Sequence, residues 1–406
     1  MKLQKVLIYM LIFLTPLIFT TNTNELYEFP KMFFVYIVGA TLIALFLLKK
    51  LVSFTPSPIL RPSKEVLFFV AAYIISTIFS MHLYTSVWGY YTRFNGGFIS
   101  VLLFLGIYIT AKNTPLKNVL TCVAITALPV GIYSVIQHFG FFGIEKELRV
   151  FSTFGQPNWS AAYLAMILPV VLIKSFVEWH LRFFWSAVFC VGYAGMWYSY
   201  SLSGLLGFAV AMIALVVLNR KLFKVHLKPV LIISAVVFLI SITSLGVFEK
   251  RVSDTVTDIK KVTFLTTHVF AQDSHKLADS GFIRTGLWKG TLNLITSNPK
   301  IFLIGTGPET FPYAFQPFRP RELNYSSEWD FVFNKPHNYY LELFANTGFL
   351  GLLAYLILIF KMLRSKHTVI VPSLIALFVS NIFSWPTVAT ALLFWVFLAL
   401  LETKSS

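Results

Sequence analysis

Long apolar stretches separated by short polar segments run through most of the 406-residue chain. A helix of about 20 apolar residues crosses the roughly 30 Å hydrocarbon core of a bilayer. The stretches that approach this length are about 6–21, 31–48, 65–81, 97–111, 118–139, 158–174, 182–199, 203–218, 229–247, 338–360, 369–383 and 386–401. The pattern therefore predicts an all-α polytopic membrane protein with about 12 transmembrane helices.

One long polar segment, residues 248–337, interrupts this pattern. All five Asp residues of the chain fall within 254–330, so the segment is too polar to span a membrane. It is also too long to be a simple connection. Inside it, apolar spacing predicts a helix over about 282–297, ended by Asn298-Pro299. We expect three parts: helices over 1–247, a large periplasmic loop over 248–337, and the last helices with a cytoplasmic tail over 338–406.

The distribution of basic residues predicts the orientation. With the N-terminus in the cytoplasm, eighteen of the 33 Lys and Arg residues lie in inside segments, and four lie in short outside loops: Lys31, Arg93, Lys146 and Arg149. Cytoplasmic loops of membrane proteins are enriched in Lys and Arg. We therefore expect both termini inside and the 248–337 loop outside, in a bacterial inner (cytoplasmic) membrane. The first stretch has no small-residue cleavage site after it, so we expect it to remain as a helix.

Composition excludes several classes of protein. Hydrophobic residues make up 57% and charged residues 12% of the chain, against about 25% charged in soluble domains. The net charge of +16 does not indicate nucleic-acid binding, because the basic residues lie between apolar stretches, where anionic membrane lipids attract them. Cys122 and Cys190 both fall in apolar stretches, so no disulfide framework is expected.

A polar cluster marks the start of the helix that follows the loop. His337 is expected in its first turn, on the outer face, where the helix dipole disfavours a protonated imidazole and leaves a neutral base. Asn338 neighbours it, and Glu342 lies about one turn deeper on the same face. An ionisable group in a membrane segment marks a functional site by default. The alternative is an interfacial histidine that caps a helix, with Glu342 only orienting its neighbours.

Three arginines are expected on the outer face, against the positive-inside trend: Arg93, Arg149 and Arg284. The planar guanidinium group suits the oxygens of a phosphate. One such contact gains about 4 kcal/mol before desolvation. The alternative role is anchoring to lipid headgroups.

Other sites have little support. His268, Asp273 and His275 have no spacing typical of a metal site, and the chain has neither a Walker motif nor an Asp-x-Asp pair. We therefore expect no metal and no cofactor. Gly305-Thr306-Gly307-Pro308 is expected to form a tight turn rather than a nucleotide loop.

Taken in order, five short motifs resemble the O-antigen ligase family, whose superfamily includes O-antigen polymerases and bacterial protein O-oligosaccharyltransferases. They are Arg149 with Gly155-Gln156-Pro157-Asn158, Ser201-Leu202-Ser203-Gly204, Arg284 with Trp288, Ile304-Gly305-Thr306-Gly307-Pro308, and His337-Asn338-Tyr339-Tyr340-Leu341-Glu342 with Gly348. The resemblance covers about residues 85–360.

The resemblance implies a metal-independent glycosyltransferase of the GT-C type. Such enzymes transfer a glycan from an undecaprenyl-diphosphate carrier to an acceptor on the periplasmic side. It implies that His337 activates the acceptor hydroxyl and that Arg149 and Arg284 hold the diphosphate, with Asn158 among the family's motif residues. Many members carry Arg where this chain has Leu202. Either that phosphate contact is missing or Arg93 supplies it.

The sequence leaves several readings open. The acceptor can be a lipid A core sugar, a growing repeat unit or a protein hydroxyl, which correspond to a ligase, a polymerase and a protein O-oligosaccharyltransferase. A lipid-linked glycan transporter or flippase is an alternative of another class. It is disfavoured because the chain shows no repeat between halves and no charged residue near the middle of a span. A non-enzymatic assembly partner is a third possibility.

Overall fold

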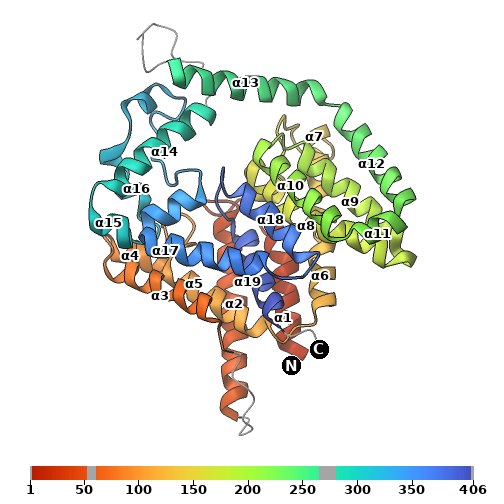
Figure 1. Cartoon of the computed structure of the whole chain (residues 1–406), viewed down its shortest axis with the longest axis horizontal. Helices are drawn as coiled ribbons and strands as arrows, with labels where there is room; N and C mark the ends of the chain where they lie inside the picture. The colour runs from red at the N-terminus through yellow and green to blue at the C-terminus, as the bar shows by residue number, and fades with distance from the viewer. Residues whose placement is uncertain (1, 53–60, 265–279, 404–406) are drawn as a thin grey trace.

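The structure, a computed structural model, describes residues 2–52, 61–264 and 280–403, and every regular element in this part of the chain is helical (Figure 1). The α-helices are α1 (Lys2–Leu14), α2 (Glu28–Val52), α3 (Lys64–Ile78), α4 (Leu83–Trp88), α5 (Phe98–Ala111), α6 (Leu116–Ile125), α7 (Ala127–Phe139), α8 (Pro157–Val177), α9 (Arg182–Trp197), α10 (Leu202–Leu218), α11 (Arg220–Val225), α12 (Leu227–Ile242), α13 (Leu245–Phe264), α14 (Ser280–Thr296), α15 (Pro299–Ile304), α16 (Phe311–Ala314), α17 (Tyr339–Leu363), α18 (Ile370–Ser380) and α19 (Val388–Glu402). A helix overlaps every stretch that was predicted to cross a membrane, which confirms the all-α class.

The apolar helices differ in length. Among the described residues, four are long and apolar enough to cross a membrane: Glu28–Val52, Leu116–Phe139, Pro157–Val177 and Tyr339–Leu363. A fifth span is formed if α12 and the first part of α13 count as one, although they meet at a bend of 67°. Helices α5, α10, α18 and α19 are apolar but shorter. The fold is that of a membrane protein with several apolar helices, and the count of 12 spans stays a prediction.

Helix α8 lies at the centre of the bundle and is almost completely buried. It packs against α9, α10 and α18. The close approach of α10 requires small residues, because a Cβ on Gly204 would collide with Ala161 of α8. In the same way, a Cβ on Gly207 would lie 2.6 Å from the Ser380 hydroxyl of α18. Small residues at such crossings are typical of packed membrane helices.

The predicted loop, residues 248–337, is largely helical in its described part and covers one end of the bundle. We call it the cap segment. In Figure 1, α13 runs across the top, and α14, α15 and α16 follow down one side. A second hydrophobic cluster, which includes Leu287, Phe311 and Phe315, joins this segment to Ala345 of α17. The helix predicted over 282–297 is confirmed as Ser280–Thr296. The segment therefore forms a packed cap on α17, next to the predicted site.

Helix α17 is broken at Gly348, whose φ of 68° and ψ of −172° are not helical. The glycine turn at the end of α15 fills the break: Thr306 N–H donates to the Ala345 carbonyl at 3.0 Å, and Gly307 N–H donates to the Asn346 carbonyl at 2.9 Å. These bonds satisfy carbonyls that a continuous helix would have bonded itself. The turn predicted at Gly305-Thr306-Gly307-Pro308 thus ties the cap segment to the helix that follows His337.

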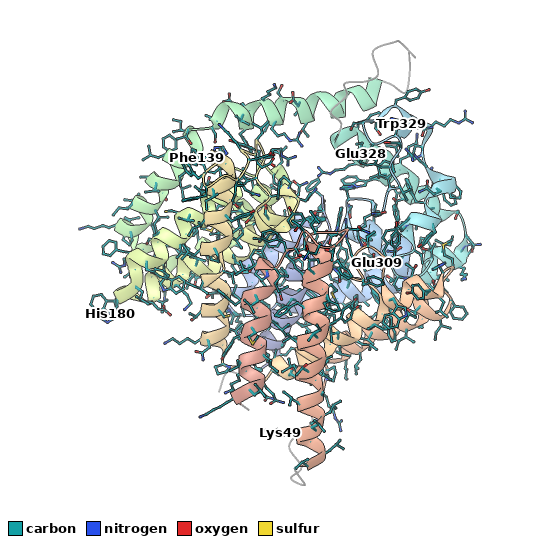
Figure 2. The ribbon with its side chains drawn as sticks, turned by 180° about the vertical axis from the view of Figure 1, so that it is seen from behind. Lys49, Phe139, His180, Glu309, Glu328 and Trp329 are labelled. Atoms are coloured by element: carbon teal, nitrogen blue, oxygen red, sulfur yellow. The ribbon has the colours of Figure 1, made fainter. Side chains whose placement is uncertain are left out.

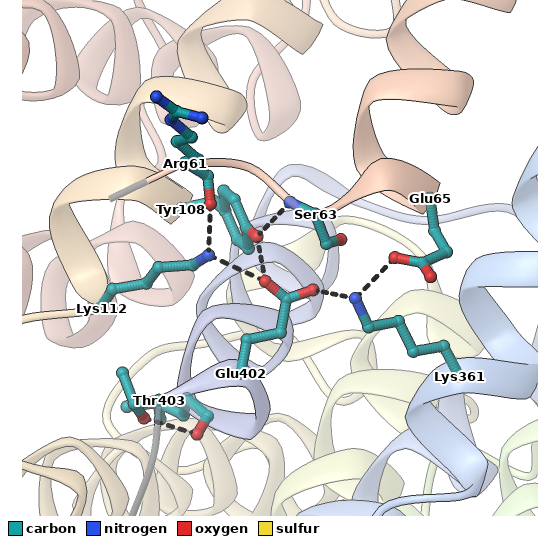
Figure 3. A network of polar contacts seen from close by, with 9 residues as sticks. Arg61, Ser63, Glu65, Tyr108, Lys112, Lys361, Glu402 and Thr403 are labelled. Atoms are coloured by element: carbon teal, nitrogen blue, oxygen red, sulfur yellow. Dashed lines mark hydrogen bonds and ion pairs between the residues drawn. The ribbon is translucent and has the colours of Figure 1, made fainter. Parts of the chain in front are cut away.

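The two ends of the molecule carry different polar groups. The first residues of α1 and the last residues of α19 lie close together in the lower part of Figure 1. There, Glu402 pairs with Lys112 at 2.8 Å and Lys361 at 2.6 Å and accepts a hydrogen bond from Tyr108, while Lys361 also pairs with Glu65 at 2.7 Å (Figure 3). The network ties α3, α5, α17 and α19 together at this end.

The cap segment lies at the other end. Figure 2 shows Lys49 at the bottom of the molecule and Glu328 with Trp329 near the top. The charge pattern had assigned Lys49 and the cap segment to opposite sides of the membrane. Their separation in the fold agrees with that assignment.

Candidate active site

His337 lies just before α17, in a backbone conformation that is fixed from both sides. Its φ is +57°, which is uncommon for a residue other than glycine. On one side, Trp288 Nε1–H donates to the Pro336 carbonyl at 3.0 Å. On the other, the Asn338 side chain caps α17 by accepting two backbone N–H groups at 3.0 and 3.1 Å. The expectation that His337 lies in the first helical turn is wrong, because α17 begins at Tyr339.

The imidazole of His337 is strongly biased towards its neutral form. Burial lowers its pKa, and the positive charges of Arg284 and Arg93 lower it further, to about 3. A neutral imidazole was expected, but the expected cause was the dipole of α17. The causes found are desolvation and two arginines from distant segments, which periodicity along one helix does not reveal.

Arg284 and Arg149 belong to the same cluster. Burial lowers the pKa of Arg149 to about 10, and the charges of Arg251 and Arg284 add to this effect. Burial also lowers the pKa of Arg284, again with Arg251 contributing. Arg149 is held in place by a hydrogen bond from Nε to the Ser199 carbonyl at 3.2 Å. Clustered, partly desolvated guanidinium groups favour a bound anion, which would relieve their mutual repulsion.

Arg251 was not singled out from the sequence. It lies on α13, whose charged residues looked like those of an ordinary polar loop. The signal that could have identified it is the one used for the other arginines, a guanidinium group on the predicted outer side. The long loop was exempt from the charge count, and within it the sequence analysis singled out Arg284, one turn before Trp288, but not Arg251.

Arg93 approaches His337 from the segment between α4 and α5. Its guanidinium carbon lies 5.1 Å from the Trp159 ring and 5.7 Å from the Trp385 ring. Within the described part of the chain, its buried Nε has no hydrogen-bond acceptor. The Trp385 ring also contacts the His337 ring, with centroids 4.9 Å apart. Two indole rings therefore hold Arg93 and leave some of its guanidinium N–H groups available to a ligand.

Asn158 ties two of the sequence motifs together. It lies in the first turn of α8, and its Oδ1 accepts a hydrogen bond from the Ser201 hydroxyl at 2.8 Å. Ser201 is in turn the N-cap of α10 and accepts the Gly204 N–H. The Gln-Pro-Asn and Ser-Leu-Ser-Gly motifs are thus neighbours in space, next to the Ser199 carbonyl that holds Arg149.

The spatial grouping of these motifs agrees with a direct comparison. Residues 185–356 match the family model described as O-antigen ligase. This segment is similar to an O-antigen ligase domain, and we call residues 185–356 by that name below. Members of this family are glycosyltransferase-like enzymes, with a lipid-linked glycan and an acceptor as their general partners. No curated protein matches the chain.

The O-antigen ligase domain contains part of the site and leaves part outside. His337, Asn338, Glu342, Arg284 and Arg251 lie within the matched residues. Three site residues precede the matched segment. Arg93 lies between α4 and α5, Arg149 lies between α7 and α8, and Asn158 lies on α8. The N-terminal helices therefore complete a group of side chains that the domain alone does not contain.

Lys335, Glu309 and Glu342 form a buried ion-pair group, two members of which lie close to His337 in the chain. The sequence did not predict this group. Lys335 donates to Glu309 at 2.7 Å and to Glu342, and all three side chains are about 90% buried or more. Burial alone would lower the pKa of Lys335, but the charges of Glu309 and Glu342 outweigh it and raise that pKa. Glu342 had been predicted as a supporting residue, and its partner Lys335 lies only two residues before His337.

No metal cluster is found within residues 2–52, 61–264 and 280–403, where no three His, Cys, Asp or Glu side chains gather closely enough to hold an ion. The weakly supported ligands His268, Asp273 and His275 lie outside the described residues. Cys122 and Cys190 are free cysteines in this structure.

Proposed function

We propose that this chain is a metal-independent, cofactor-free glycosyltransferase that transfers a glycan from an undecaprenyl-diphosphate carrier to an acceptor hydroxyl at the periplasmic face of a bacterial inner membrane. The observation that carries the proposal is the convergence of a neutral imidazole, His337, with the charges of Arg93 and Arg284. The O-antigen ligase domain supports the general class of reaction.

The proposed reaction is a single displacement at the anomeric carbon. His337 accepts the proton of the acceptor hydroxyl as its oxygen attacks that carbon. The bond from the same carbon to the diphosphate oxygen breaks, and its electron pair leaves with undecaprenyl diphosphate. The configuration at the sugar is inverted. Arg93, Arg149 and Arg284 stabilise the charge that grows on the leaving diphosphate.

Donor binding is expected to activate the base. In the free protein, nearby arginine charges help hold the pKa of His337 at about 3, where imidazole is a weak base. A bound diphosphate brings negative charge to the same arginines and cancels part of their field. The pKa of His337 then rises towards its ordinary value. The base would thus become effective when the leaving group is in place.

The remaining side chains act by positioning. Asn338 fixes the start of α17 after His337, and Asn158 holds the Ser201 turn beside Arg149. Glu342 orients Lys335 next to the base. We assign to Arg93 the phosphate contact that Leu202 cannot make, because its charge acts directly on His337.

The proposed orientation follows from the reaction. Helices within 1–247 and 338–406 form a GT-C type bundle of about 12 spans with both termini in the cytoplasm, and residues 248–337 form the periplasmic segment. Membrane lipids surround the bundle, and nucleic acid has no role. The acceptor is a lipid, sugar or protein hydroxyl.

Replacement of His337 by Ala tests this function. With lipid-linked glycan extracted from the source cells, turnover should fall by about 10²–10⁴ because the positioned base is lost. Binding of the lipid-linked glycan should be retained, because the arginines remain. Release of undecaprenyl diphosphate and transfer of the glycan would be measured on purified protein in lipid vesicles.

His180→Ala is a matched control, since His180 is exposed and lies away from the site (Figure 2). It should leave turnover unchanged. Full turnover in His337→Ala would contradict the proposal. A transporter or an assembly partner would also tolerate that change.

A further inference from the structure

A long groove lies between α10 and α12, apart from the candidate active site. It holds about 720 Å³, within the roughly 300–1,000 Å³ typical of ligand sites. One wall consists of Phe208, Met212, Val216 and Arg220, which follow one another at intervals of four residues along α10 and the turn after it. The facing wall is α12, and buried side chains of α8 and α9 lie at the base. Two antiparallel helices thus enclose a channel that runs along both of them.

The lining of the groove is apolar except at one end. Apart from two basic residues, its polar side chains are Ser234 and Ser241. The Ser241 hydroxyl is already bonded to the Tyr193 hydroxyl at 2.7 Å and to the Val237 carbonyl at 2.8 Å. A sugar or a nucleotide would leave its own polar groups unpaired here, at a cost in free energy. The groove therefore suits a hydrocarbon chain.

The length of the groove corresponds to one leaflet of a bilayer. From Phe208 to the end of α10 at Leu218, the helix rises about 15 Å. This is half of the roughly 30 Å hydrocarbon core. An acyl chain of a lipid in one leaflet fits this length, whereas an undecaprenyl chain is much longer.

Two positive charges mark one end of the groove. Arg220 and Lys224 line this end, one turn apart on α11, and both are exposed. None of the ion pairs among the described residues includes either of them. Between them, the Phe223 ring packs on Phe176 of α8 with centroids 5.3 Å apart, which fixes α11 to the bundle. The two cations are therefore held in place and available to an anionic headgroup.

This basic end lies far from the candidate active site. Helix α10 begins next to Ser201, beside Arg149, and Arg220 follows its opposite end, about 25 Å away along the helix. A lipid whose diphosphate is held by the active-site arginines cannot place the same phosphates on Arg220. The charge pattern predicts that Arg220 faces the cytoplasm, where the leaflet carries anionic lipids.

We propose that this groove binds one anionic phospholipid of the cytoplasmic leaflet, with an acyl chain between α10 and α12 and its phosphate on Arg220 and Lys224. Helix α12 runs along the edge of the molecule from α11 to α13 and packs mainly against α9 (Figure 1). The bound chain fills the space between α12 and α10 and so supports α12. The lipid takes no part in the proposed reaction, so the lipid site and the reaction can fail separately.

Lipid binding to the purified full-length protein tests this site. Delipidated protein in a neutral detergent would be titrated with phosphatidylglycerol or phosphatidylcholine, and bound lipid would be counted by native mass spectrometry. Phosphatidylglycerol should bind with the lower Kd, because only this lipid has a net negative charge. When Arg220→Gln is combined with Lys224→Gln, its Kd should rise about thirtyfold, because two charge contacts are lost.

The matched control for charge combines Lys221→Gln with Lys228→Gln. Both lysines are exposed at the same end of the bundle, and neither lines the groove. This pair removes the same net charge and should leave the Kd for phosphatidylglycerol near its original value.

A tryptophan tests the place of the acyl chain. Val216 is an exposed lining residue, so Val216→Trp should fill the groove and raise the Kd for phosphatidylglycerol about tenfold. Val217→Trp is the control, since Val217 is also exposed but does not line the groove. It should leave the Kd unchanged.

Four results would overturn the proposal. Three are equal Kd values for the two lipids, equal losses in the two glutamine pairs, and unchanged binding in Val216→Trp. The fourth comes from competition with undecaprenyl phosphate, which should displace phosphatidylglycerol only weakly because its chain exceeds the groove. Displacement at a lower concentration than phosphatidylglycerol itself requires would assign the groove to the carrier lipid instead.

Discussion

At the scale of single residues, the main feature is how His337 stays uncharged. Burial and two arginines from other segments lower its pKa to about 3. The folded and unfolded values then differ, so protonation between about pH 3 and the ordinary range of histidine favours the unfolded chain. Stability due to this group is full at neutral pH and is lost as the pH falls. Keeping His337 neutral therefore makes the folded protein less stable at acid pH.

The pH dependence of catalysis should report the arginines that surround His337. Removing one positive charge makes protonation of the imidazole easier, so Arg284→Gln should raise the pKa of His337. The acidic limb of kcat/KM, which reports groups of the free enzyme, should then move to higher pH in this variant. A pH series of kcat/KM on the purified protein would measure the shift.

Arg321→Gln serves as the control, because Arg321 is exposed on the cap segment. Its profile should match that of the unchanged protein. An acidic limb that stays in place in Arg284→Gln, or moves to lower pH, would show that the two groups do not interact.

Most of the candidate site residues could be predicted from the sequence because each stood out against a local rule. Arg93, Arg149 and Arg284 opposed the positive-inside trend, and His337 preceded an apolar helix. Glu309 could not be found this way, since its partner Lys335 is 26 residues away and their pairing depends on tertiary packing. Whether these residues perform the proposed reaction remains a prediction.

At the scale of helices, the length of the apolar stretches predicted where helices occur but not where a helix breaks. The stretch predicted over 338–360 is one helix, α17, but it breaks at Gly348. Gly348 was visible in the sequence within an apolar run. The break could not be inferred from that alone, because it depends on the N–H groups of Thr306 and Gly307, which come from another segment and bond the freed carbonyls.

Gly348→Ala should destabilise this junction. The φ of 68° and ψ of −172° belong to a region that only glycine adopts readily, at a cost of about 1–3 kcal/mol for other residues. The added Cβ would also overlap the backbone of Leu303 and Ile304, which cannot move as a flexible side chain can. We expect a lower Tm in detergent and reduced turnover.

Gly246→Ala is the matched control for this change. No heavy atom lies within 4 Å of a Cβ built on Gly246, and its φ is ordinary. It should leave Tm and turnover near their original values. A Gly348→Ala protein as stable as this control would show that the break in α17 is easily relaxed.

At the scale of the whole molecule, the charge pattern and the fold agree on two ends. The network around Glu402, at the end of α19, joins Lys112 and Lys361, two residues predicted to face the cytoplasm (Figure 3). The base and the arginines lie towards the cap segment instead. A membrane placed across the bundle would therefore separate the two groups. The orientation of the protein in that membrane decides on which side the reaction occurs.

Chemical labelling in intact cells would determine the orientation of the protein in the membrane. Trp329 and Lys366 are exposed at the two ends, on the cap segment and after α17. In a background without the natural cysteines, Trp329→Cys should react with a membrane-impermeant maleimide in intact cells, and Lys366→Cys should react only after permeabilisation. This outcome follows if inside loops carry the excess of Lys and Arg. The reverse pattern would place His337 on the cytoplasmic side, away from a periplasmic acceptor, and the proposed reaction could not occur there.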